Sequence, residues 1–310
     1  MNQIQRKNPF WSLAGPLLAY FGIQLAVQTV IQAVIQAPYL AEAYIDNFVN
    51  SGAADFQEAM DGYLSAAGPA IEQVLKYQVE IAGAAALCTI PLTAVLFAKD
   101  RKLERSWGIA PAEKTPVRKY WSIILFGVIL SVGVTCLSAM VQAALYDEQY
   151  QETAEIMYSA SFPMQLLVMG LVMPLAEELM FRGVLFRRYQ ETRRFWSSAL
   201  WSSLFFALTH TNNIQIVYAF FLGLCLCYLY ERFGSFKAPV VLHISANTAS
   251  LIFTETGVFG WLGNEPIRMA AAVILSAFLC SSLFVLMQRM TVREKEEIHE
   301  ENNDPMNMFR

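Results

Sequence analysis

Long apolar runs separated by short polar stretches dominate the pattern of this chain. Each run is about 20 residues long, which as a helix is enough to cross the roughly 30 Å hydrocarbon core of a bilayer. A hydropathy reading therefore predicts an all-α fold, a polytopic transmembrane helical bundle of about eight spans. The predicted spans cover residues 10–36, 78–98, 119–145, 162–186, 195–211, 214–232, 239–256 and 267–288.

Residues 54–77 depart from this pattern, because polar positions recur among the apolar ones. Glu72, Lys76 and Glu80 follow one another at intervals of four residues, which places them on one face of a helix. A helix with one polar face is typical of a segment that is partly solvated. We expect an external amphipathic stretch here.

The charged residues change sign from one loop to the next. Residues 42–61 and 146–155 are acidic, whereas 99–121 and 187–196 are basic. Lysine and arginine mark the cytoplasmic side of membrane proteins. With Arg6 and Lys7 before the first span, this predicts that both termini are cytoplasmic. The short loops and the lack of targeting elements favour a bacterial plasma membrane as the location.

The composition supports a membrane protein and excludes one class of partner. Hydrophobic residues make up 55% of the 310 residues and charged residues only 15%, whereas soluble domains carry about 25% charged residues. The formal net charge is −4, and no basic arm is interleaved with aromatic residues. The chain is therefore not expected to bind nucleic acid.

Three polar clusters interrupt the apolar spans of the second half. An ionisable residue in a span is costly, so such residues usually face the interior of the bundle and mark a functional site. The clusters are Glu177, Glu178 and Arg182; His210; and His243 with Asn247.

Helical geometry gives two of these clusters a shape. Glu178 and Arg182 are four residues apart and can pair on one face, whereas Glu177 is rotated by about 100° and can face a cavity. His243 and Asn247 also share a face. Pro174 lacks a backbone N–H, so it frees a carbonyl and can bend the helix to open a pocket.

The hairpin between the fourth and fifth spans predicts that Glu177 and His210 meet. Both lie roughly 25 Å from the turn at "YQETRR", at 1.5 Å per residue. His243 fits a simple ladder of spans less well, because it follows the turn at "ERFGSFK" by only a few residues. Convergence of all three clusters requires spans that are tilted, short or partly outside the bilayer.

The clusters match three motifs in order. "EELMFR" fits EExxxR, "FALTH" fits FxxxH through Phe206 and His210, and "HISAN" fits HxxxN. In these motifs the chain resembles the CAAX protease and bacteriocin-processing membrane proteins, also called the Abi family or type II CAAX prenyl endopeptidases. The resemblance covers about residues 160–256. It implies an intramembrane endopeptidase that activates water with a glutamate.

The resemblance assigns catalytic roles to four residues. Glu177 would be the general base that activates water, assisted by His210. His243 and Asn247 would stabilise the oxyanion of the tetrahedral intermediate. The general chemistry agrees, since donors aimed at a developing oxyanion in a dry site lower the barrier.

Three other residues would support the site. Glu178 and Arg182 would position it, and Phe206 would pack near it. The resemblance implies neither a metal nor another cofactor. We expect N-terminal spans with an external acidic loop at 1–158, a catalytic CAAX-protease-like core at 159–260, and a last span with a charged cytoplasmic tail at 261–310.

Several alternatives remain open from the residues alone. Glu177, His210 and His243 could instead be ligands of a zinc protease, although HExxH is absent. The clusters could also be a buried ion pair, a buried histidine and an interhelical hydrogen-bonded pair. The protein would then be a non-catalytic immunity protein or scaffold that binds a peptide, or, on weaker grounds, a transporter. The expected partners are the bilayer and a membrane-associated peptide or protein, lipidated or not, reaching the site from the cytoplasm or the bilayer. The sequence gives no oligomeric state.

Overall fold

The computed structural model of the chain describes residue 6 and residues 8–50, 55–109, 114–145 and 148–303. In this part of the chain every regular element is a helix and no strand occurs. The all-α fold predicted from the sequence is confirmed. Lys7, the first two residues of the acidic loop at 146–155 and the end of the tail at 304–310 lie outside the described residues.

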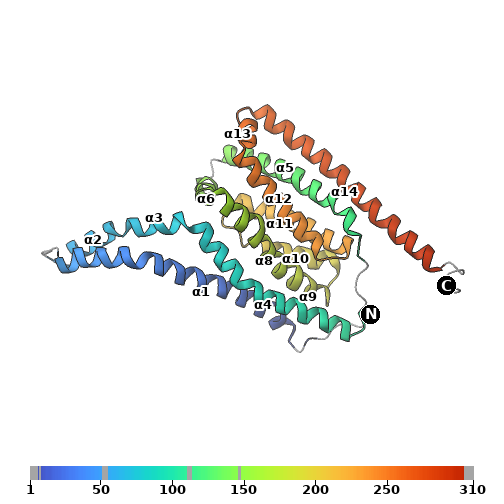
Figure 1. The fold of residues 1–310 in the computed structure, drawn as a ribbon, viewed down its shortest axis with the longest axis horizontal. Helices are drawn as coiled ribbons and strands as arrows, with labels where there is room; N and C mark the ends of the chain where they lie inside the picture. The colour runs from blue at the N-terminus through green and yellow to red at the C-terminus, as the bar shows by residue number, and fades with distance from the viewer. Residues whose placement is uncertain (1–5, 7, 51–54, 110–113, 146–147, 304–310) are drawn as a thin grey trace.

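The helices form one bundle with a projecting arm (Figure 1). Most of the long helices follow the apolar runs. They are α1 (Pro9–Tyr44), α4 (Gln78–Ser106), α5 (Trp121–Leu145), α11 (Asn213–Phe233), α12 (Lys237–Glu255) and α14 (Pro266–Asn303). The shorter ones are α2 (Phe56–Ala66), α3 (Gly68–Lys76), α6 (Glu148–Tyr158), α10 (Phe195–Ala207) and α13 (Val258–Gly263).

The fourth apolar run is one continuous rod built from α-helical and π-helical segments. It consists of α7 (Phe162–Gln165), the π-helical η3 (Leu166–Val172), α8 (Met173–Glu178), the π-helical η4 (Leu179–Phe186) and α9 (Arg187–Gln190). A π-helical segment shifts the backbone hydrogen bonds by one residue and is frequent at functional sites. This rod is the most buried of the candidate spans, because it lies between α4, α10 and α12.

Six helical segments are long and apolar enough to cross a membrane by length and composition, among the described residues. They are Pro9–Asn50, Gln78–Ser106, Val117–Leu145, Phe162–Gln190, Asn213–Phe233 and Pro266–Met290. The other two predicted spans correspond to α10 and α12. With 13 residues, α10 reaches only about 20 Å at 1.5 Å per residue, and α12 carries the polar HISAN motif.

The projecting arm contains the segment predicted to be amphipathic. Its helices α2 and α3 fold back along α1, which continues into a π-helical segment, Ile45–Asn50 (Figure 1). Asp55 caps α2 by accepting a hydrogen bond from the backbone N–H of Glu58 at 2.8 Å, as aspartate commonly does at a helix N-terminus. The helical character of the segment is thereby confirmed, and its external location stays a prediction.

Candidate active site

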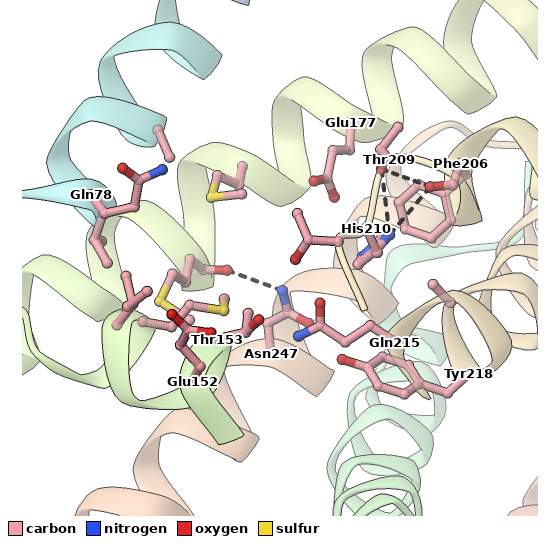
Figure 2. Close-up of a pocket in the computed structure, with 18 of the residues that line it drawn as sticks. Gln78, Glu152, Thr153, Glu177, Phe206, Thr209, His210, Gln215, Tyr218 and Asn247 are labelled. Atoms are coloured by element: carbon pink, nitrogen blue, oxygen red, sulfur yellow. Dashed lines mark hydrogen bonds between the residues drawn. The ribbon is translucent and has the colours of Figure 1, made fainter. Parts of the chain in front are cut away.

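Four residues from separate segments line one cavity of about 610 Å³ (Figure 2). Glu177 comes from α8, His210 from the turn between α10 and α11, and His243 and Asn247 from α12. Convergence is possible because α10 is short: it ends at Ala207, so His210 does not lie at the far end of a full-length span. In a simple ladder of full-length spans, His210 and His243 would lie at different depths. The short α10 removes this difficulty.

The adjacent glutamates have different surroundings. Glu178 is fully buried, and its Oε1 accepts a hydrogen bond from Nη1 of the fully buried Arg182 at 2.7 Å. The Glu177 side chain is 15% exposed and lines the cavity. The pairing of Glu178 with Arg182 and the cavity-facing Glu177 are both as the helical spacing predicts.

Arg182 is held on several sides. Its guanidinium lies over the ring of Phe206, 4.3 Å from the ring centroid, which is a cation–π contact. Gly223 of α11 leaves room for it, because a Cβ at that position would lie 3.0 Å from Nη2 of Arg182 and 2.8 Å from Cβ of Ser203.

His243 connects the two glutamates. Its Nδ1 lies 2.9 Å from Oε1 of Glu178, and its Nε2 lies 3.7 Å from Oε2 of Glu177. A carboxylate paired with an arginine only accepts hydrogen bonds. Nδ1 of His243 therefore carries a proton and donates a hydrogen bond to Glu178. Nε2 is therefore the atom of His243 that is left for chemistry next to Glu177.

His210 is oriented by its own turn. Its Nδ1 lies 3.3 Å from the carbonyl oxygen of Phe206 and 3.4 Å from Oγ1 of Thr209 (Figure 2). A carbonyl only accepts, so Nδ1 is protonated and Nε2 is free to accept a proton. His210 lines the same cavity as Glu177, and it is His243 that lies against the Glu177 carboxylate.

Phe206 does more than fill space beside the site. Its ring stands edge-on to both imidazoles, with ring centroids 5.2 Å from His210 and 5.7 Å from His243. It is fully buried and also contacts Arg182. One aromatic ring thus fixes the relative positions of three polar side chains.

Asn247 is anchored by a backbone carbonyl that has no hydrogen-bond partner within the rod from α7 to α9. The N–H of Met173 donates to Val168 in the π-helical register, and Pro174 has no N–H to offer. The carbonyl of Met169 therefore lacks a partner within the helix, and Nδ2 of Asn247 donates to it at 3.1 Å (Figure 2). This is a carbonyl freed beside Pro174, as the sequence predicts, although its partner was not foreseen. The second amide hydrogen of Asn247 remains available to a ligand in the cavity.

Sequence reasoning missed the part of the cavity farther from the motifs. Side chains of α3, α4 and α6 line it, among them Leu75, Gln78 and Glu152. Gln215 and Tyr218 of α11 complete the wall. No short motif marks these positions, because they come from segments whose packing against the core depends on the tertiary fold.

A metal centre has no ready set of ligands in the described part of the chain. No group of three or more histidine, cysteine, aspartate or glutamate side chains there is placed to hold a metal ion. The zinc ligand set considered from the sequence, Glu177, His210 and His243, is therefore not assembled as a metal site.

The family model described as "Type II CAAX prenyl endopeptidase Rce1-like" matches residues 159–249. Over these residues the chain is therefore similar to the Rce1-like CAAX protease family, which confirms the resemblance drawn from the three motifs. The matched region lies within the predicted core at 159–260, whose outer boundaries stay predictions.

Two curated relatives match parts of the chain. The "Putative membrane peptidase YdiL" of Bacillus subtilis (strain 168) is 26% identical over 107 residues, which cover 34% of this chain and 44% of that protein. The "Uncharacterized 24.3 kDa protein" of Escherichia coli is 32% identical over 93 residues, which cover 28% of this chain and 43% of that protein. The chain spans less than half the length of these relatives. No solved structure matches it.

Proposed function

We propose that the protein is an intramembrane endopeptidase that hydrolyses peptide bonds of membrane-associated or lipidated substrates with water activated by Glu177. One observation carries the proposal. Of two adjacent glutamates, Glu178 is neutralised by Arg182, and Glu177 is presented to a cavity that also holds two histidines and an asparagine. The family match and the similarity to a protein named as a membrane peptidase support the reaction class.

The geometry supports a division of roles in the hydrolysis. Glu177 takes a proton from water as the oxygen attacks the scissile carbonyl, and His210 assists through its free Nε2. The oxyanion that forms accepts a hydrogen bond from the second amide hydrogen of Asn247. His243 contributes through Nε2 when that atom carries a proton, because its Nδ1 proton is held by Glu178. Glu177 then returns the proton to the leaving amine, and the C–N bond breaks.

Location and orientation form part of the proposal. The basic loops lie in the cytoplasm with both termini, in a bacterial plasma membrane. The family match says nothing of bacteriocin processing or of the Abi name, so these associations stay predictions from the motifs.

The test is cleavage by the purified full chain in liposomes, using a library of membrane-tethered peptides. Wild type is compared with Glu177→Gln, which removes the base but keeps the shape of the side chain, and with His210→Ala. Glu155→Gln is the matched control, because Glu155 is an exposed glutamate of α6 that is not part of the cavity wall. All proteins are run with and without a chelator.

We expect Glu177→Gln to lose at least about a hundredfold in rate, as removal of a general base does. His210→Ala should lose less, and Glu155→Gln nothing. Cleavage that survives Glu177→Gln contradicts the assignment of the base, and cleavage that stops with the chelator supports the zinc alternative. Folded wild-type protein that cleaves no peptide supports the immunity or scaffold alternative.

A further inference from the structure

Helix α1 carries a row of glutamines at intervals of four residues, inside a segment apolar enough to span a membrane. The row, called the glutamine ridge below, consists of Gln24, Gln28, Gln32 and Gln36. Residues spaced by four form one ridge along a helix. All four glutamines are partly buried, whereas Leu25, Val30 and Val34 of the same helix are exposed. The apolar side of α1 thus faces the lipid, and the glutamine ridge is turned away from it.

One end of the glutamine ridge lies close to the proposed base. The hydroxyl of the preceding Tyr20 is within hydrogen-bonding reach of the side chains of Gln24 and Thr89. Tyr20 is only 2% exposed, and its ring stands edge-on to that of Phe181, with ring centroids 6.0 Å apart. The phenol also interacts electrostatically with Glu177. The ridge therefore starts within electrostatic range of Glu177.

The middle of the glutamine ridge reaches the cavity itself. Gln32 belongs to the cavity wall together with Gln78 and Glu177. The cavity opens near the arm, because Leu75 of α3 and Glu152 of α6 are exposed and also belong to its wall. Helices α3 and α4 pack along α1 in this region (Figure 1). The ridge thus runs from the neighbourhood of the base, past the cavity wall, toward the arm.

Three amides of the glutamine ridge have no partner. Within the part of the chain that the structure describes, the side chains of Gln28, Gln32 and Gln36 make no hydrogen bond. An amide in an apolar environment is costly unless a hydrogen-bond partner satisfies it. A ligand that supplies both donors and acceptors would satisfy all three.

The spacing of the glutamine ridge matches an extended peptide. Successive glutamines are about 6 Å apart along the helix axis, at 1.5 Å per residue. In an extended chain the N–H and C=O of one residue point to the same edge, and this pair recurs every two residues, about 6.7 Å apart. Three glutamines therefore span about 12 Å, and five extended residues present three such pairs over about 13 Å. Each glutamine amide offers both donors and an acceptor, so it can pair with both groups of one residue.

We propose that Gln28, Gln32 and Gln36 bind the main chain of the substrate as an extended segment of about five residues. Tyr20 and Gln24 hold the inner end of the glutamine ridge near the base. The proposal rests on the proposed protease function and deepens it, because it states how the substrate is recognised. The ridge pairs with N–H and C=O groups, so it selects an extended conformation and tolerates many side chains. A helical segment pairs these groups internally and must unwind before it binds.

A second copy of the chain is the competing occupant, since polar side chains also join transmembrane helices to one another. Two observations favour the substrate. The exposed side of α1 is apolar at Leu25, Val30 and Val34, so a partner helix on that side would not meet the glutamine ridge. Gln32 lines the same cavity as Glu177, which is where a substrate must lie.

The first test measures binding of a neutral palmitoylated decapeptide to the full-length Glu177→Gln protein in liposomes. N-methyl groups are placed on alternate residues of the peptide, in the odd or in the even register. Each methyl group removes one N–H donor and blocks that edge of the extended chain. We expect one register to raise Kd by about tenfold or more, as the loss of two or three hydrogen bonds does, and the other to raise it by less than about threefold. Equal effects of the two registers overturn the proposal, and this test needs no change in α1.

The second test replaces glutamines of the ridge by methionine, which keeps the length of the side chain but has no amide. Gln28→Met and Gln32→Met should each raise Kd for the unmethylated peptide by about three- to tenfold. The double variant should bind the two methylated registers equally. Gln57→Met is the matched control, because Gln57 is an exposed glutamine of α2 outside the cavity wall, and it should change neither result. A double variant that still distinguishes the registers contradicts the role of the ridge.

Oligomeric state and cleavage separate the remaining outcomes. Weaker binding by Gln32→Met that accompanies a change from dimer to monomer, measured by light scattering in detergent, overturns the proposal in favour of helix pairing through α1. Binding that depends on the register supports the proposal even if wild type cleaves no peptide, in which case the protease function fails alone. Cleavage by wild type without any dependence on the register supports the protease function and refutes the role of the glutamine ridge.

Discussion

The two adjacent glutamates illustrate how neighbouring residues of one type acquire different surroundings. A rotation of about 100° per residue turns Glu178 into the bundle and Glu177 toward the cavity. Glu178 then holds both Arg182 and His243 through Oε1, at 2.7 and 2.9 Å. Glu177 has no such partner closer than the 3.7 Å contact with His243. We therefore propose that Glu178 serves stability and Glu177 serves reactivity.

Replacing each glutamate by glutamine separates these two properties. Glu178→Gln leaves Arg182 buried without a counter-charge, and breaking a buried pair costs about 3–5 kcal/mol. We expect a markedly lower melting temperature in detergent and reduced activity. Glu177→Gln should unfold close to the wild-type temperature while losing its activity. Both are measured by thermal unfolding and cleavage on the same preparations, and a Glu178→Gln protein as stable as wild type contradicts the role of the pair.

The sequence allowed part of this arrangement to be predicted. The spacing of Glu178 and Arg182 defines a contact within one helix, which needs no tertiary information. The contact of His243 with both glutamates joins residues of α8 and α12, which are separated in the chain by η4, α9, α10 and α11. No local spacing determines how those helices pack, so the hairpin argument indicated only His210 as a neighbour of Glu177.

Among the helical elements, the rod from α7 to α9 shapes the site through its backbone. Its two π-helical segments lie on either side of α8, which carries the glutamates. The shifted register around Met173, together with Pro174, leaves the Met169 carbonyl to Asn247. The proline thus acts on a side chain of another helix.

Pro174→Ala tests this coupling. Alanine restores an N–H that can donate to Met169 in the π-helical register, so it competes with Asn247 for the same carbonyl. We expect kcat to fall by up to about tenfold as the orientation of Asn247 is lost, with KM little changed. The melting temperature should not fall, because alanine is favoured over proline inside a helix.

Pro91→Ala is the control for Pro174→Ala. Pro91 also lies inside a helix, α4, but is exposed and outside the cavity wall. It should leave kcat unchanged. If the two variants lose activity equally, helix stiffness rather than the Asn247 contact accounts for the loss.

The predicted spans agree with the helices where a long apolar run forms one long helix. The prediction is less accurate for α10, which is shorter than its apolar run. The apolar run there continues through "FALTH", and hydropathy does not distinguish a short helix followed by a turn from a full span. The turn is stabilised by contacts such as the hydrogen bond from the Gln215 N–H to Asn212 at 2.8 Å, which caps α11. The depth of His210 in the bundle depends on this turn.

At the scale of the whole molecule, a buried network joins the start of the chain to the bundle far from the cavity opening. Arg188 of α9 donates to Oδ2 of Asp100 in α4 at 2.6 Å. Arg6 donates to Asp100 at 2.9 Å and to Glu191 at 2.6 and 2.7 Å. The hydrogen bonds with Glu191 raise the pKa of Arg6 above its ordinary value. Arg6 therefore stays charged at every pH below its ordinary pKa, and its ion pairs hold as long as Asp100 and Glu191 are ionised.

Asp100→Asn tests whether this network holds the arm helix α1 to the bundle. Asparagine fills the same space but leaves Arg188 and part of Arg6 without a counter-charge, so we expect a loss of about 3–5 kcal/mol in stability. Proteolysis should cut the segment before α1 faster than in wild type. The control is Asp61→Asn, which alters an exposed aspartate of α2 and should change neither property.

The Asp100→Asn variant also tests whether the ion-pair network at one end of the bundle affects the cavity around Glu177. Asp100 and Glu177 lie on different helices, and the network shares no residue with the cavity wall. Cleavage per folded molecule should therefore stay within about twofold of wild type at low temperature, since distant sites without shared partners act additively. A collapse of kcat in folded Asp100→Asn protein would show that the rod from α7 to α9, which carries Arg188 at one end and Glu177 near its middle, transmits strain from the network to the site.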